Sequence, residues 1–70
     1  MTTDQLDEEF SELESVVRLF KIESEIAFNA ESFSKMMQHV TDFLKHVMNS
    51  DEPEDISTTR LRMVSEILKI

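Results

Sequence analysis

The stretch LDEEFSELESVVRLF (residues 6–20) places an apolar side chain at every third or fourth position, with mostly acidic and polar side chains between them. The apolar positions are Leu6, Phe10, Leu13, Val17 and Phe20. Because steps of three and four residues return to the same side of an α-helix, these side chains form one apolar stripe. The stretch therefore predicts an amphipathic helix over about residues 4–28, which Thr3 or Asp4 can cap.

A second stretch, IAFNAESFSKMMQHVTDFLKHV (residues 26–47), repeats this spacing in a different register. Its apolar positions are Ile26, Ala30, Phe33, Met37, Val40, Leu44 and Val47. It predicts a second helix over about residues 30–49, with Met36 and Phe43 at the edge of its stripe. The second stripe is displaced by one residue from the continuation of the first, which is about 100° around a helix.

Two arrangements accommodate this displacement. In one, the chain breaks near residues 29–32, where Asn and Ser suit a helix cap or a tight turn, and folds into an antiparallel helical hairpin. In the other, one helix runs over about residues 4–49 and its stripe winds around it. A chain of 70 residues can bury its own apolar surface only by turning back, so the hairpin is favoured.

Residues 50–56 form an acidic loop around Pro53, the only proline. A third helix is expected over about residues 57–69, capped by Asp55 or Ser57, with Lys69 at its carboxyl end, the favourable pole for a cation. Its apolar face would consist of Leu61, Val64, Ile67 and Leu68. The chain is thus predicted to be a single all-α domain over residues 1–70, a helical hairpin plus a short third helix with a coiled-coil-like seam.

The size of this domain favours association. Seventy residues provide a small core, and without cysteine neither disulfides nor thiolate zinc sites can stabilise it. We expect oligomerisation or a partner protein to complete the core. We also expect Phe33 and Leu44 to be buried and Glu8, Glu12 and Lys35 to be exposed.

The net charge of −8 argues against several kinds of partner. Residues 1–14 contain six acidic and no basic side chains, and the seven basic residues of the chain never cluster. Phosphate backbones and anionic membranes both require clustered lysine and arginine, so neither nucleic acid nor a membrane is an expected partner. An acidic start and the lack of a long apolar run predict a soluble, intracellular, cytoplasmic protein.

The most ligand-like residues, His39, Asp42 and His46, share one side of the second helix. Histidines seven residues apart are separated by about 10 Å along the axis, too far to bind one zinc ion through bonds of about 2 Å. Catalytic groupings are also missing, because the Ser and Thr residues are expected on helix faces and caps and no glycine is present to shape a strained loop. We predict no metal, no cofactor, no small-molecule substrate and no enzymatic activity.

Two functions remain. The first is a non-catalytic protein–protein interaction module: a small helical subunit, adaptor or chaperone-like partner that binds a second copy of itself, as a homodimer or higher oligomer, or a helix of another protein. The alternative is an acidic inhibitor or nucleic-acid mimic, whose amino-terminal carboxylates would block a basic site on a target. The predicted interface of the first function consists of Leu6, Phe10, Leu13, Val17, Phe20, Phe33, Met37, Val40 and Leu44.

Overall fold

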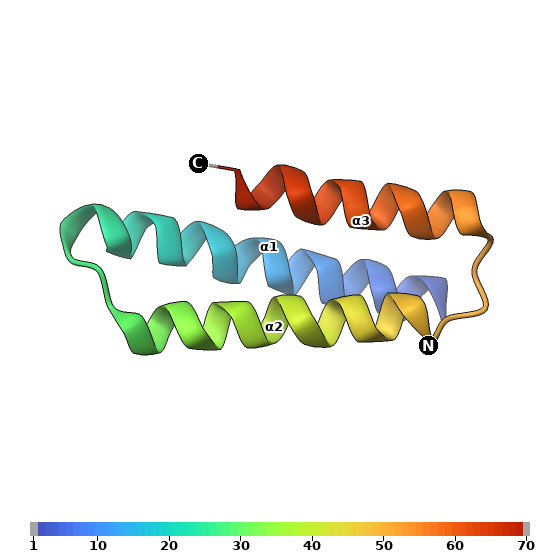
Figure 1. The fold of residues 1–70 in the computed structure, drawn as a ribbon, viewed down its shortest axis with the longest axis horizontal. Coiled ribbons are helices and arrows are strands. Elements are labelled where there is room, and N and C mark those ends of the chain that lie inside the picture. The colour runs from blue at the N-terminus through green and yellow to red at the C-terminus, as the bar shows by residue number, and fades with distance from the viewer. Residues whose placement is uncertain (1, 70) are drawn as a thin grey trace.

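The computed structural model describes residues 2–69 and consists of three helices: α1 (Thr3–Ile26), α2 (Ala30–Met48) and α3 (Glu54–Leu68). No strand occurs within residues 2–69, which confirms the all-α prediction. The three helices lie along the long axis of a molecule measuring 40 × 18 × 15 Å. Helices α1 and α3 run in the same direction and α2 runs in the opposite one (Figure 1).

The two ends of α1 are set by local hydrogen bonds. Thr2, rather than Thr3 or Asp4, caps the helix, and its side chain and backbone exchange hydrogen bonds with Gln5 in a capping box. At the other end the backbone of Ala27 becomes extended, with φ −157° and ψ 126°. The Asn29 side chain then accepts hydrogen bonds from the backbone N–H groups of residues 31 and 32 and starts α2. Residues 27–29 therefore separate α1 from α2, and one helix over 4–49 does not form.

Helix α3 begins at Glu54, three residues earlier than expected, so the connection between α2 and α3 is shorter than the loop expected over 50–56. Neither Asp55 nor Ser57 caps it. Instead the Pro53 carbonyl accepts hydrogen bonds from the backbone N–H groups of Ile56 and Ser57, each with an N···O distance of 3.1 Å. Proline fixes φ near −65° and has no N–H to satisfy, which suits it to this boundary. Both connections are built without positive φ at any residue of the described chain, which explains how it folds without glycine.

The core runs along the line where the three helices meet. Phe43 is completely buried at its centre, and the ring of Phe10 packs against it with centroids 5.7 Å apart. The buried apolar side chains are Leu6, Leu13, Val17, Met36, Val40, Phe43, Val47 and Val64. Each helix thus contributes to a single core through one side of its surface.

The buried side of α2 differs from the expected one. Met36 and Phe43, expected at the edge of the stripe, are buried, whereas Phe33, expected to be buried, is 42% exposed. Leu44 is half-buried and packs against the core. The prediction for Phe33 was therefore wrong, while Glu8, Glu12 and Lys35 are exposed as expected.

The reason lies in the third helix. Phe43 packs against Phe10 of α1, and residue 36, seven residues earlier, lies on the same side of α2. Residues 33, 37 and 44 are displaced from residue 36 by about 60–100° around the helix, and α3 has only 15 residues. Leu44 is covered by this arrangement, but Phe33 and Met37 extend past the end of α3 at Leu68. The unequal helix lengths thus decide which apolar residues of α2 stay exposed.

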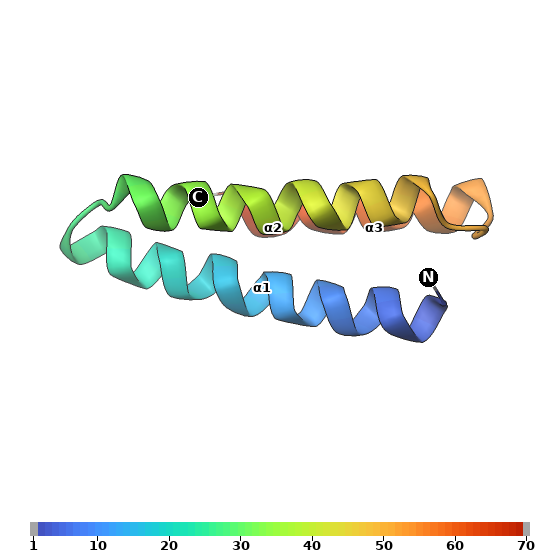
Figure 2. The same ribbon diagram turned by 90° about the horizontal axis from the view of Figure 1, so that it is seen from below.

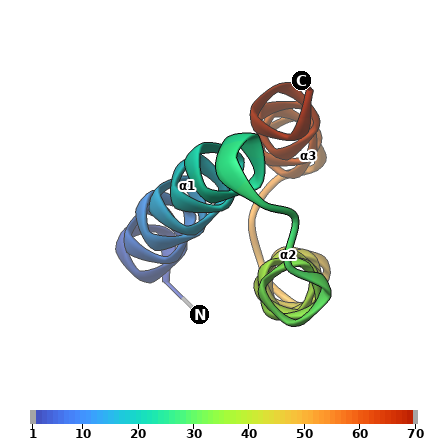
Figure 3. The same ribbon diagram turned by 90° about the vertical axis from the view of Figure 1, so that its left-hand side faces the viewer.

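Helix α1 is inclined to the other two helices, which overlap when the bundle is turned by 90° (Figure 2). Viewed along the bundle, α2 and α3 both lie on one side of α1 (Figure 3). The opposite side of α1 is therefore covered by neither helix.

Within residues 2–69, none of the three helices combines the length and apolar character needed to cross a bilayer.

We predict that Phe43→Ala lowers the free energy of unfolding by about 3–5 kcal/mol, because it removes a completely buried ring from the centre of the core. Phe28→Ala is the matched control, since this ring is 66% exposed, and it should cost less than about 1 kcal/mol. Urea denaturation followed by circular dichroism measures both values. Equal losses in the free energy of unfolding for Phe43→Ala and Phe28→Ala would show that Phe43 is not at the centre of the core.

Candidate functional site

An apolar groove opens at the end of the bundle that contains the α1–α2 turn. We call it the turn-end groove. It encloses about 470 Å³ and lies between α1, α2 and the carboxyl end of α3. Its lining residues are Val17, Phe20, Lys21, Ser24, Glu25, Phe33, Met36, Met37, Leu68 and Lys69. Because α3 ends at Leu68, the groove continues the line of α3 over the uncovered part of α1 and α2.

Three phenylalanine rings pack together at the α1–α2 turn, and two of them, Phe20 and Phe33, line the groove. Phe20 of α1 contacts Phe33 of α2 and Phe28 of the connecting segment, with centroid distances of 5.7 and 6.1 Å. The centroids of Phe28 and Phe33 are 6.0 Å apart, which closes the triangle. These separations lie in the range of favourable aromatic pairs. Phe20 and Phe33 thus present apolar surface to the groove, and the 66% exposed ring of Phe28 packs against their outer side.

Lys21 closes the groove where α3 ends. Its ammonium donates hydrogen bonds to the backbone carbonyls of Ile67 and Lys69, at 2.6 and 2.8 Å. The last carbonyls of a helix have no partner within the helix and carry a partial negative charge, so a cation is favourable there. Lys69 was expected to serve this pole, but its ammonium pairs with Glu66 instead. Lys21 thus joins α1 to the end of α3 through charged hydrogen bonds.

Most of the residues proposed as an interface are used inside the chain. Leu6, Leu13, Val17 and Val40 are buried in the core. Phe10, Phe20 and Leu44 are partly buried and pack against it. Phe33 and Met37 remain 42% and 36% exposed, and with Phe20 they line the turn-end groove. The structure therefore brings four of the nine predicted interface residues, the buried Val17 with Phe20, Phe33 and Met37, together in the lining of one groove.

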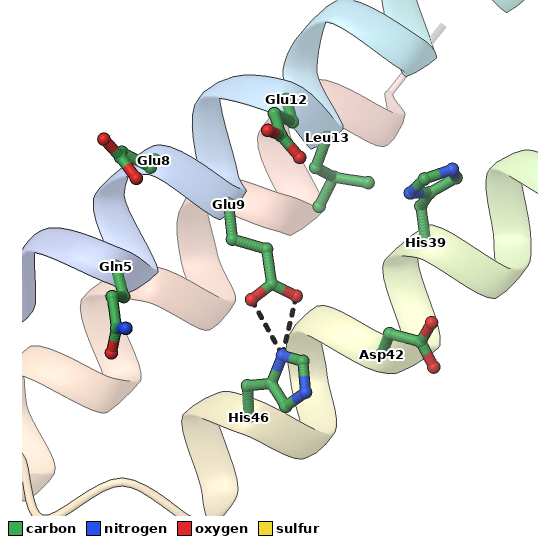
Figure 4. Close-up of a pocket in the computed structure, with 8 residues that line it drawn as sticks. All are labelled: Gln5, Glu8, Glu9, Glu12, Leu13, His39, Asp42 and His46. Atoms are coloured by element: carbon green, nitrogen blue, oxygen red, sulfur yellow. Dashed lines mark hydrogen bonds and ion pairs between the residues drawn. The ribbon is translucent and has the colours of Figure 1, made fainter. Parts of the chain in front are cut away.

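The acidic side of α1 and the histidine side of α2 form a second hollow, of about 320 Å³ (Figure 4). Here His46 Nδ1 lies 2.7 Å from both carboxylate oxygens of Glu9. The contact is an ion pair when the imidazole is protonated, and otherwise a hydrogen bond from Nδ1–H of the neutral ring to the carboxylate. His39 and Asp42 point away from this pair rather than toward a common centre (Figure 4). Among the described residues no group of three or more His, Asp or Glu side chains is arranged to hold a metal ion.

The six amino-terminal carboxylates do not form one free acidic surface. Glu9 contacts His46, Asp7 pairs with Arg60 at 2.8 Å, and Glu14 pairs with Arg18 at 3.6 Å. Three of the six therefore make contacts within the chain. An inhibitor that imitates phosphates through all six side chains would have to release those contacts first.

A buried arginine connects three parts of the bundle at the opposite end from the groove. Arg60 of α3 donates two hydrogen bonds to the Glu52 carboxylate, from Nε at 2.7 Å and Nη2 at 2.8 Å. Its Nη1 donates to Asp7 of α1 at 2.8 Å. The Thr3 hydroxyl donates to Glu52 at 3.1 Å, so the start of α1 and the α2–α3 connection share this network. Every buried side-chain nitrogen and oxygen in residues 2–69 has a partner, so the network is saturated and holds the fold.

The network shifts the ionisation of its members. Hydrogen bonds from the Arg60 guanidinium, assisted by the Thr3 hydroxyl, hold the pKa of Glu52 below its ordinary value of 4.5 although burial opposes this. The hydrogen bond to Glu52 and that to Asp7 raise the pKa of Arg60 above its already high value. Both groups are therefore charged throughout the neutral range.

The sequence interpretation missed this network. Glu52 looked like part of a solvated acidic loop, and Leu61 was assigned to the apolar face of the third helix. Instead Leu61 is 42% exposed, and Arg60 occupies the inward position four residues before Val64. One signal was available: Arg60, Val64 and Ile67 have the spacing of a single helix side, so an arginine lay in the apolar series.

Comparisons of the chain with models of protein families, with curated protein sequences and with solved structures gave no match.

We predict that Lys21→Met speeds amide hydrogen exchange in the last turn of α3 and costs about 0.5–2 kcal/mol of stability, because it leaves the carbonyls of Ile67 and Lys69 without their cation. Methionine keeps the apolar stem. Lys35→Met is the control, since Lys35 pairs only with the exposed Glu31. If both variants leave α3 exchange unchanged, the Lys21 contacts do not hold the helix end.

The depressed pKa of Glu52 predicts a pH dependence of stability. Because the charged form is favoured in the folded state, its contribution is complete above the ordinary value of 4.5 and is lost as pH falls through the lower folded-state pKa. Glu52→Gln should reduce stability above pH 4.5 and flatten this part of the profile. Urea denaturation over the acidic range measures the two profiles. Glu54→Gln, an exposed neighbour, should leave the wild-type slope intact, and parallel profiles for wild type and Glu52→Gln would contradict the assignment.

Proposed function

We propose that this chain is a non-catalytic protein–protein interaction module that binds an apolar helix segment of a partner protein in the turn-end groove. The observation that carries the proposal is the exposure of Phe33 and Met37 in a groove of about 470 Å³. An exposed apolar concavity bordered by charged side chains is typical of sites that take up a helix from another protein.

The chemistry of the groove supports a helix as the ligand. Phenylalanine and methionine side chains line it, and thioether side chains adapt to differently shaped apolar partners. Lys21 and Lys69 lie at its border on the α3 side, and Glu25 lies beside them. A helix with one apolar side and a mixed-charge border complements this arrangement. The groove thus offers binding and orientation rather than a reacting group.

The experiment compares tagged wild-type protein with the double variant Phe33→Gln/Met37→Gln as bait in a lysate of the source cells, with quantitative mass spectrometry of the captured proteins. We predict that a specific partner is captured by wild type and lost with the double variant, because two polar amides replace the apolar floor of the groove. The captured partner is then produced separately and its affinity measured by calorimetry.

The matched control is Leu61→Gln/Met63→Gln, because both side chains are 42% exposed but neither lines the groove. Retention with this control and loss with the groove variant supports the proposal, and equal capture by all three baits contradicts it. Binding to a groove of this kind should also survive high salt. If capture instead collapses as salt rises and Glu8→Gln/Glu12→Gln abolishes it, an acidic inhibitor is the better description.

A further inference from the structure

A second apolar surface lies on α1, on the side that neither α2 nor α3 covers (Figure 3). Leu19, Ile22 and Ile26 are 58%, 60% and 87% exposed. Counting about 100° per residue from the buried Val17, all three lie within about 40° of the opposite side of the helix. We call these three residues the outer stripe. None of them lines the turn-end groove, so the two surfaces are separate.

The residues of the outer stripe are spaced as in helices that pack against another helix. Its members are three and four residues apart and cover about 10 Å of the helix axis. Toward the start of α1 the same side continues with Glu8, Glu12 and Ser15, which are polar and exposed. An apolar contact on this side of α1 is therefore confined to the half of the helix near the turn.

Charge is divided between the two halves of the bundle in a way that matters for self-association. Residues 15–40 and 64–69, the half around the turn, contain four basic and four acidic side chains, whose charges cancel. The remaining residues contain three basic and eleven acidic side chains and carry the whole net charge of −8. Two copies can therefore approach each other through their turn halves without net repulsion, but not through their acidic halves.

We propose that the outer stripe is a homodimer interface, in which α1 packs antiparallel against α1 of a second copy with a two-fold axis beside Ile22. A two-fold axis requires one surface patch to match itself, and the antiparallel arrangement does this by placing Leu19 of each copy beside Ile26 of the other. It also separates the acidic halves. Asp4 lies 18 residues from Ile22, so the two Asp4 side chains are about 54 Å apart, far beyond the Debye length of about 8 Å.

Charge complementarity along the stripe selects the same arrangement. Arg18 lies four residues before Ile22 and Glu25 three residues after it, and both border the stripe on the same flank, at about 100° and about 80° from Val17. Reversing one helix about Ile22 brings Arg18 of one copy beside Glu25 of the other, and the symmetry forms this pair twice. A parallel dimer would instead align the acidic segments of residues 4–14.

Sedimentation equilibrium of the full chain, from about 1 µM to about 500 µM, tests the dimer. We expect wild type to reach about twice the chain mass of 8.2 kDa. Ile22→Glu places two carboxylates at the axis and should raise the dissociation constant more than about a hundredfold. Ile56→Glu, at an isoleucine that is 40% exposed on α3, should leave the dimer intact. Circular dichroism verifies that both variants remain folded.

Charge exchange tests the orientation independently of Ile22. Arg18→Glu and Glu25→Arg should each weaken the dimer about two- to tenfold, and the double variant Arg18→Glu/Glu25→Arg should restore it. If net charge alone set the affinity, the two single variants would change the dissociation constant in opposite directions. Arg18→Glu makes the chain more acidic, whereas Glu25→Arg makes it less acidic. Opposite effects of the two single variants, or a double variant that stays as weak as the single ones, would overturn the antiparallel pairing.

A chain that stays monomeric over the whole range, or a dimer that Ile22→Glu leaves unchanged, would overturn the interface itself. If Phe33→Gln/Met37→Gln dissociates the dimer and Ile22→Glu does not, the second copy occupies the turn-end groove and the outer stripe is not the interface. Leu19, Ile22 and Ile26 do not line the groove, whereas Glu25 of the charge-exchange test does. Failure of the dimer in the Ile22→Glu test therefore leaves the proposed function of the groove to its own test.

Discussion

The length of α3 is the constraint on which the rest of this structure depends. Its 15 residues lie against helices of 24 and 19 residues, so the third helix covers only part of the line along which α1 and α2 meet. Where α3 is present, the core is closed around Phe43. Beyond Leu68, the apolar residues that continue the same series become the lining of a groove. Core and candidate site are thus two parts of one apolar surface, separated by the end of a helix.

Charged contacts fix the position of α3 at its middle and at its end. In the middle of the helix Arg60 binds Glu52 and Asp7, which belong to the preceding connection and to α1. At its end Lys21 of α1 donates to the last carbonyls. A small apolar core tolerates sliding of one helix along another, because apolar contacts have little directionality. Directional contacts at these two places oppose such sliding, and they thereby fix where the groove begins.

The sequence predicted the three helices because their apolar spacing and caps are local properties. It failed for Phe33, because α2 carries apolar residues over more of its circumference than one neighbour can cover. Which of these residues stays exposed depends on how far α3 extends along α2. This is a property of the tertiary structure, and the spacing of apolar residues in the sequence does not predict it. The Arg60 network was missed for a related reason, since its partner Asp7 lies 53 residues away. Of the candidate site, the sequence identified Val17, Phe20, Phe33 and Met37 but not Lys21, whose role requires the end of α3 to be in place.

The division of charge along the bundle connects the network to the free surfaces. The buried Arg60 neutralises part of the acidic half, where Glu52 and Asp7 would otherwise repel each other, so the half with the excess negative charge is also the half with the strongest internal ion pairs. The half around the turn needs no such pairs because its charges cancel, and it leaves Phe33, Met37 and the outer stripe uncovered. In the proposed homodimer, acidic repulsion would keep one half of each molecule apart from the other copy, while the half with no net charge would supply the apolar contact.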